Sequence, residues 1–331
     1  MSNSVDVSTV SSRERAQGAA PAEPVEERWW PSRYGADDQL GTLNEITPTK
    51  VVAAARLVRQ GRVYDLGRTL HENVPAFPGR FWRQTLVATA HLANPRRPGG
   101  MQATAHSAMG WGKNRVNWLI ELVTGTLQIG TQLDGLNHLQ IGDRFYNGWR
   151  AQDIVEDWGT SKLGIETVPP VLTRGVLIDV PRYRGVARLE AGEVITPDDV
   201  RGALRVQGVG EVMPGDAVLF HTGWGALWDG DPSAFNAGEP GVGMAVAGWL
   251  VERRVALTGA DTWSFGAVPS EDPERPFLVP QTLNVKHGLF IMENLATEVL
   301  AGAGVHEFLF ALTHHKTRGS TAAVIAPAAV V

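Results

Sequence analysis

The residues best suited to chemistry lie in one short stretch, 127–143, which reads LQIGTQLDGLNHLQIGD. Four polar side chains stand there at even separations: Gln128, Gln132, Asp134 and His138. In an extended segment, residues at even separation project to the same side, so these four groups would face one point. Such a cluster of carboxylate, amide and imidazole groups predicts a site for a single metal ion. The alternative is a polar turn in which Asp134 and Asn137 bond nearby backbone amides.

The composition narrows the chemistry that such a site can support. The chain has 331 residues and no cysteine, which excludes thiolate ligands, disulfides and cysteine nucleophiles. A serine elbow of the GxSxG kind and a Walker-type glycine loop are missing from the sequence, which favours metal-dependent hydrolysis over a serine mechanism or nucleotide binding. The formal net charge is only -5 and both signs are interspersed, which argues against nucleic acid as a partner.

The N-terminal region differs in composition from the rest of the chain. Residues 1–27 are rich in Ser, Ala, Glu and Pro with almost no large apolar groups, which predicts a disordered tail. Residues 28–331 show no repeat and no break in composition, which predicts one catalytic domain. No apolar run approaches the ~20 residues that cross a bilayer, and no stretch is typical of a signal peptide. We therefore expect a cytoplasmic protein without membrane partners.

Short apolar stretches of strand length alternate with helical patterns, which predicts a mixed α/β fold. The expected strands lie within residues 62–67, 174–180, 216–222 and 255–261. The expected helices lie at residues 48 to about 59, 197–207, 243–254 and 295–304. Thr47 and Thr196 are expected to cap two of these helices, because each precedes a proline at the first helical position.

The stretch QIGTQLDGLNH resembles the HxGTHxDxPxH motif of the cyclase family, which includes bacterial kynurenine formamidase and isatin hydrolase. Gln stands at both leading His positions, and GTQ in place of GTH is typical of one subgroup. Further blocks similar to the family follow in family order: GDRFYNGW, LFHTGWGALW, TGADTW and VKHGLFIMENL. The resemblance therefore extends from about Trp29 to the C-terminus, and ordered blocks are stronger support than one short motif.

The resemblance implies a fold, a site and a reaction. The fold would be a single swivelling β/β/α domain with a mixed sheet flanked by helices, in a homodimer that contributes loops to each site. Gln128, Gln132 and Asp134 would occupy metal-ligand positions, His138 the catalytic position, and Glu293 would bind metal or share the proton. A divalent ion lowers the pKa of bound water to about 7, so His138 as general base would complete attack on a cyclic or aryl amide.

Three expected imidazoles are absent, which changes the metal preference. Gln128 and Gln132 are neutral oxygen ligands, and Pro280 and Gln281 stand where family members often carry a metal-facing His. Zinc affinity should therefore fall relative to a harder ion such as manganese or magnesium. One rival hypothesis is a cyclase or dehydratase that acts on a polyketide-like or other aromatic precursor without strong metal binding. A second is a catalytically inactive protein that binds a small molecule.

Three further residues are candidates for substrate binding. His221 follows a predicted strand and precedes TGW, where it would contact substrate or cap local backbone. Trp224 and Trp263 are candidates for the wall of a pocket, because small-molecule sites usually have apolar walls with few polar groups. We expect His314 and His315 to be structural rather than metal ligands.

Overall fold

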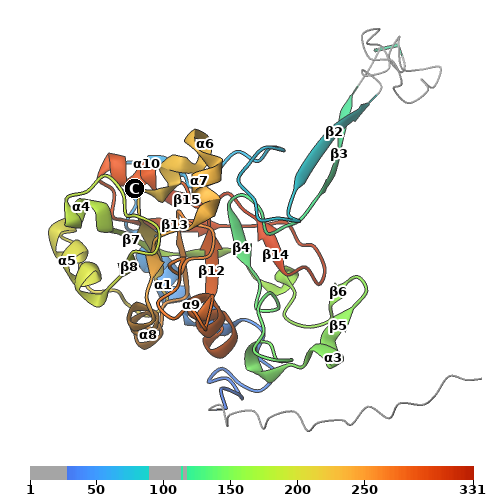
Figure 1. Cartoon of the computed structure of the whole chain (residues 1–331), viewed down its shortest axis with the longest axis horizontal. Coiled ribbons are helices and arrows are strands. Elements are labelled where there is room, and N and C mark those ends of the chain that lie inside the picture. The colour runs from blue at the N-terminus through green and yellow to red at the C-terminus, as the bar shows by residue number, and fades with distance from the viewer. Residues whose placement is uncertain (1–27, 89–112, 115–117) are drawn as a thin grey trace, which may run out of the picture.

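The computed structural model describes residues 28–88, 113–114 and 118–331, and the predicted tail at 1–27 lies outside them. Its centre is a mixed sheet (Figure 1), which has nine strands within the described part of the chain. Their order is β1 (Val63–Asp65), β15 (Ala328–Val330), β13 (Glu307–Leu312), β7 (Val171–Asp179), β9 (Ala217–His221), β11 (Leu257–Ala260), β12 (Phe290–Glu293), β4 (Gln132–Asp134) and β14 (Ala322–Val324). The four strands β7, β9, β11 and β12 are parallel, and the outer strands pair antiparallel. The predicted α/β class is confirmed.

The central strands are buried on both faces, which explains their nearly continuous apolar sequences. In β9, Ala217 and Leu219 belong to one core cluster, whereas Val218 and Phe220 belong to a second cluster on the other side of the sheet. Strands β7, β9 and β11 confirm three of the predicted strands. Residues 62–67 form only the three-residue edge strand β1.

Helices cover the sheet where their apolar residues meet these two clusters. Helix α5 (Pro197–Gln207) begins with a capping box at Thr196 and ends at Gly208, as predicted. It packs with α8 (Met244–Glu252) through residues of the second cluster, whereas α10 (Glu298–Ala303) contributes Leu300 to the first.

Helix α1 (Pro48–Ala55) is shorter than the sequence predicted. The predicted end near residue 59 is wrong, because the backbone tightens to i→i−3 hydrogen bonds after Ala55. The shorter elements connect the layers: α3 (Ala151–Ile154), α4 (Val180–Arg184), α6 (Leu227–Gly230), α7 (Pro232–Ala237), α9 (Leu278–Gln281), β5 (Val155–Glu156), β6 (Gly159–Thr160), β8 (Val194–Ile195) and β10 (Gly241–Val242). None of the helices in the described ranges is long and apolar enough to span a membrane.

A two-stranded arm projects from the body of the molecule (Figure 1). It consists of β2 (Trp82–Ala88) and β3 (Leu119–Gly125), which pair antiparallel with each other. Every residue of β3 is exposed. The arm begins directly after Arg80 and returns to the body just before Gln128, so its base adjoins the polar stretch singled out in the sequence.

Candidate active site

The polar stretch reaches the sheet only through the short strand β4. Residues 127–131 and 135–140 are bends and turns rather than extended chain, so the predicted same-side projection along one strand is wrong. Gly130 bends the chain with a φ of 64°, and the backbone N–H of His138 donates to the carbonyl of Gly135 over 3.1 Å. The predicted turn role of Asn137 also differs, because its amide reaches Thr160 Oγ1, 2.7 Å away.

Strand pairing brings the distant carboxylate to this stretch. Strands β12 and β4 run antiparallel, and Glu293 stands opposite Gln132 (Figure 1 shows the two strands side by side). The Gln132 Nε2 donates to Glu293 Oε2 over 2.7 Å and to Asp134 Oδ1 over 3.2 Å. One amide therefore links two carboxylates from segments that lie far apart in the sequence.

A second polar contact lies beside the first. Gln128 Nε2 donates to Thr321 Oγ1 over 2.6 Å and lies 3.3 Å from His138 Nδ1. An amide nitrogen can only donate, so Nδ1 of a neutral His138 accepts and its proton resides on Nε2. This contact makes His138 a hydrogen-bond donor through Nε2.

Asp134, His138 and Glu293 line one cavity of about 390 Å³. Its other walls are mostly apolar and include three aromatic rings, of which Trp263 stands 4.4 Å from Phe77 between ring centroids, edge to face. The larger walls and one cation come from other segments: Phe77, Arg80, Trp263 and Phe277. Sequence analysis had selected Trp263 but missed the other three, because nothing in their local patterns distinguishes them from loop residues.

The two carboxyl groups carry strongly perturbed electrostatics. Asp134 is 2% exposed and Glu293 is 6% exposed. Burial raises the pKa of Glu293 well above its ordinary value, and the charges of Asp134 and Glu239 raise it further. Burial also raises the pKa of Asp134, although His138 and Arg80 oppose this change. The Gln132 amide joins the two groups, and the charge of Asp134 disfavours ionisation of Glu293.

A third buried carboxyl, that of Glu239, supports the wall of the cavity. It accepts hydrogen bonds from the backbone N–H groups of Trp263 and Ser264, at 2.6 and 2.9 Å, and from the Ser264 hydroxyl at 2.6 Å. Burial raises the pKa of Glu239 to about 8. The sequence offered no signal for this role, because Glu239 lies in a loop beside Gly and Pro.

The donor atoms of this site do not fit a divalent metal. No three His, Asp or Glu side chains in the described part of the chain are grouped to hold an ion. A ligating Gln132 would present its oxygen, yet Oε1 is buried without a hydrogen-bond partner and Nε2 lies between the carboxylates. Turning the amide over would set Oε1 against two carboxylate oxygens. A metal held between these two carboxylates would therefore face the amide nitrogen of Gln132 rather than its oxygen, which is the wrong atom for a ligand.

The other predicted substrate residues lie away from the lining of this cavity. His221 Nδ1 is 2.8 Å from Thr297 Oγ1 and 3.4 Å from Asp261 Oδ2. Burial opposes protonation of His221, but the hydrogen bond and charge of Asp261 outweigh it and raise the pKa. Trp224 is 4% exposed and donates its indole N–H to the carbonyl of Phe235, which also accepts from Trp263. Trp224 therefore supports Trp263 through a shared acceptor, whereas His221 is held by Thr297 and Asp261.

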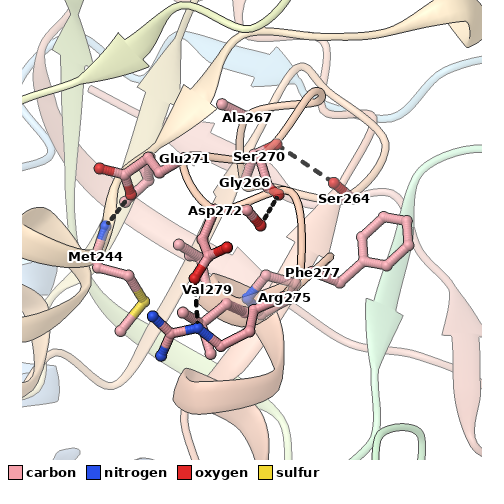
Figure 2. Close-up of a pocket in the computed structure, with 13 residues that line it drawn as sticks. Met244, Ser264, Gly266, Ala267, Ser270, Glu271, Asp272, Arg275, Phe277 and Val279 are labelled. Carbon is pink, nitrogen blue, oxygen red and sulfur yellow. Dashed lines mark hydrogen bonds and ion pairs between the residues drawn. The ribbon is translucent and has the colours of Figure 1, made fainter.

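A smaller pocket of about 200 Å³ adjoins the cavity (Figure 2). The two share Ser264, Phe277 and Pro280 as walls. Phe277 is 42% exposed and lines both spaces. Figure 2 also shows Glu271 bound to the backbone of Met244 on the far side, which fixes the outer wall to the start of α8.

Comparison with known proteins identifies similar chains. Residues 64–267 match the family described as "Putative cyclase". A solved structure of a novel cyclase is 30% identical, with a TM-score of 0.77, and the match covers 91% of this chain and 98% of that one. Isatin hydrolase A from Ralstonia solanacearum shares the fold at 19% identity and a TM-score of 0.58, with 86% and 98% covered. An isatin hydrolase bound to the product analogue thioisatinate has 16% identity and a TM-score of 0.56, with 86% and 99% covered. No curated protein sequence matches the chain.

Proposed function

Since the chain belongs to the cyclase family, we propose that it is an enzyme that hydrolyses a flat cyclic or aryl amide. The observation that carries this proposal is the meeting of Asp134, His138 and Glu293 at one cavity with aromatic walls. A single buried carboxyl is often structural. Two that are joined through one amide, beside an imidazole and a guanidinium, suit an acid–base site, because burial raises the pKa of Glu293 more strongly than that of Asp134.

The two carboxyl groups divide the proton transfers. Burial raises the pKa of Asp134, and the positive charge of Arg80 limits this rise. Asp134 as the carboxylate accepts a proton from water as the water oxygen attacks the amide carbon. Glu293, whose pKa is raised further by its neighbours, is protonated and gives its proton to the leaving nitrogen as the C–N bond breaks. Water and amide thus become a carboxylic acid and an amine, and a proton returning from Asp134 to Glu293 restores the pair.

Positive charge and hydrogen-bond donors stabilise the oxygen that becomes negative. Arg80 lines the cavity, and its Nη1 also donates to the carbonyl of Gln128 over 3.3 Å, which holds the guanidinium in place. His138 offers Nε2–H because Gln128 engages Nδ1. Preorganised donors of this kind contribute about 3–4 kcal/mol each to a transition state. We therefore assign His138 a donor's role in place of the general-base role expected from the sequence.

The aromatic walls support a flat substrate. Trp263 lies between Phe77 and Phe277, with ring centroids 4.4 and 6.3 Å away. Isatin hydrolases, which share the fold, act on isatin according to their name. A fused or aryl amide combines a ring for these walls with a carbonyl for Arg80.

Paired variants test this proposal, with isatin and formanilide as probe cyclic and aryl amides. Asp134→Asn and Glu293→Gln should each lower kcat/KM by about 10²–10⁴-fold, because each removes one proton transfer. The exposed Glu252→Gln is the matched control and should leave kcat/KM unchanged. Full activity in both pocket variants would overturn the acid–base assignment. Binding of the probes without turnover by any form, the wild type included, would instead favour the inactive binder.

Metal analysis and chelation test the metal-dependent form of the reaction that the family resemblance implies. The poor fit of Gln132 as a ligand supports turnover that survives removal of divalent ions. Activity lost on chelation and restored by manganese or zinc would overturn the proton-transfer mechanism above. Unchanged activity after chelation, in protein shown to be metal-free, would support it.

A second candidate function is cyclisation or dehydration of an aromatic precursor. The protonated Glu293 beside Asp134 favours it, because such reactions need only a proton donor and acceptor. Incubation in H₂¹⁸O separates the two candidates. Hydrolysis places the label in the product carboxyl, whereas dehydration leaves the organic product unlabelled.

We also propose that the chain forms a homodimer. The arm exposes Leu119, Ile120 and Leu122 at 56, 53 and 59%, and an isolated two-stranded hairpin is marginally stable in water. Burial against a second copy would remove these side chains from water. Sedimentation should give twice the monomer mass, and Leu122→Glu should shift the protein to monomer.

A further inference from the structure

A second, basic cavity of about 320 Å³ lies apart from the carboxylate cavity. It forms between residues 28–34 and the end of the π-helix Thr282–Lys286, with Tyr146 as a further wall. Its basic lining residues come from both segments: Arg28, Arg33, Lys286 and His287. Its volume lies at the lower end of the range for small-molecule sites, roughly 300–1,000 Å³.

The positive charge of this cavity is not neutralised by its own walls. No carboxylate lines it, and Arg28, Arg33 and Lys286 make no ion pair within the ranges that the structure describes. Burial lowers the pKa of His287, and the charges of Arg33 and Lys286 lower it further. The cavity therefore presents a positive field that an anion would relieve.

The nearby carboxylates are already engaged. Glu45 pairs with Arg254 over 2.6 Å and accepts the Tyr34 hydroxyl over 2.5 Å. Asp38 accepts from the backbone of Gly41, the side chain of Asn44 and the Tyr146 hydroxyl. These hydrogen bonds hold both carboxylates behind the tyrosines rather than against the basic side chains.

The same hydrogen bonds determine which part of each tyrosine can contact a ligand. The Tyr34 and Tyr146 hydroxyls are used by Glu45 and Asp38, so their rings rather than their polar tips remain for a ligand. Trp29 adds a third ring, and Lys286 Nζ lies 5.7 Å from its centre. Rings beside cations suit a ligand that has a flat face and a negative group.

We propose that this cavity is a binding site for a small aromatic carboxylate, separate from the site of catalysis. Arg33 and Lys286 supply charge for the carboxylate, and guanidinium groups bind such oxygens in a forked geometry. Trp29, Tyr34 and Tyr146 supply the surface for the ring. The proposal stands whether or not the amide hydrolysis above is correct, because it uses none of the same side chains.

Calorimetry on the full chain with benzoate as the probe tests the site. The double variant Arg33→Gln/Lys286→Gln should weaken benzoate binding at least ten-fold. The matched control Arg59→Gln/Arg205→Gln removes the same charge from exposed positions elsewhere and should change binding less than two-fold. In the wild type, NMR should show the ring protons of His287 shifting as benzoate binds.

Two further anions test the assigned chemistry. Acetate lacks the ring and inorganic phosphate replaces the carboxylate, so both should bind at least five-fold more weakly than benzoate. Equal binding of phosphate and benzoate would overturn the aromatic part of the assignment. Absence of saturable benzoate binding, or equal loss in the control variant, would overturn the site itself.

Discussion

Replacement of Gln132 by methionine isolates the effect of the amide that joins the two buried carboxyls, Asp134 and Glu293. Methionine matches the length of glutamine and keeps the space filled, so the change removes hydrogen bonds without creating a cavity. The variant loses the donors to Glu293 Oε2 and Asp134 Oδ1. It also loses the buried Oε1, which has no hydrogen-bond partner in the described structure. Burial of an unpaired oxygen destabilises the fold, so this part of the change is stabilising.

The magnitude depends on the charge of the acceptors. With one carboxyl ionised, the two hydrogen bonds stabilise the fold by about 2–4 kcal/mol, and relief of the unpaired oxygen returns about 1–3. The net loss should be about 1–2 kcal/mol. With both carboxyls neutral, the bonds are worth about 1–3 kcal/mol and the net change should be near zero.

The sign of the pH dependence follows from the raised pKa of Asp134. Gln132 favours the ionised carboxylate, so its removal raises this folded-state pKa further above the unfolded value. A raised carboxyl pKa leaves stability intact below the unfolded pKa and loses it as pH rises through the folded pKa. The destabilisation should therefore grow as pH rises above the ordinary carboxyl pKa of about 4, and measurements at one low and one high pH would show it.

Urea unfolding at both pH values measures this difference, with Gln140→Met as the control because that side chain is exposed. An equal loss of stability at both pH values would refute the reasoning, since it would mean that the amide does not act on ionised carboxyls. A loss that appears only when a divalent ion is present would refute it as well. That result would indicate that the Gln132 amide oxygen binds a metal.

Three further predictions concern the surroundings of the cavity. Asp261→Asn should destabilise the fold by about 2–4 kcal/mol at neutral pH, because the ionised carboxylate accepts hydrogen bonds from Thr222 and pairs with His221. Thermal unfolding measures this loss of stability, which should shrink as pH falls through the lowered pKa of Asp261. Glu239→Gln should flatten the fall in stability with rising pH by about 1.4 kcal/mol per pH unit between about 4.5 and 8, and an unchanged slope would contradict burial of an ionisable group there. Trp263→Leu should raise the KM for isatin at least ten-fold while altering the far-ultraviolet circular dichroism little; an unchanged KM would remove this ring from the substrate wall.

The sequence predicted most of the regular structure near the parallel strands. The short apolar run within 216–222 and the capping Thr196 before Pro197 are local signals, and both gave the expected elements. The extension of α1 to about residue 59 failed because the tightening of its last turn leaves no mark in the apolar pattern. Extended chain through residues 127–143 failed for a related reason, since the turn at Gly130 depends on backbone geometry.

The sequence by itself determined which side chains are candidates for proton transfer or metal binding. Residue type and the ordered blocks of the cyclase family are properties of the chain alone. Tertiary structure decided which of them meet. Glu293 reaches Gln132 only because β12 pairs with β4, and Arg80 joins them only because the arm begins at the same edge. Strand order and register depend on the whole core, so no local pattern along 331 residues encodes them. The same packing sets the Gln132 amide nitrogen between two carboxyls, since burial leaves each polar atom only the partners that the fold supplies. The metal-ligand role of Gln132 stays a prediction.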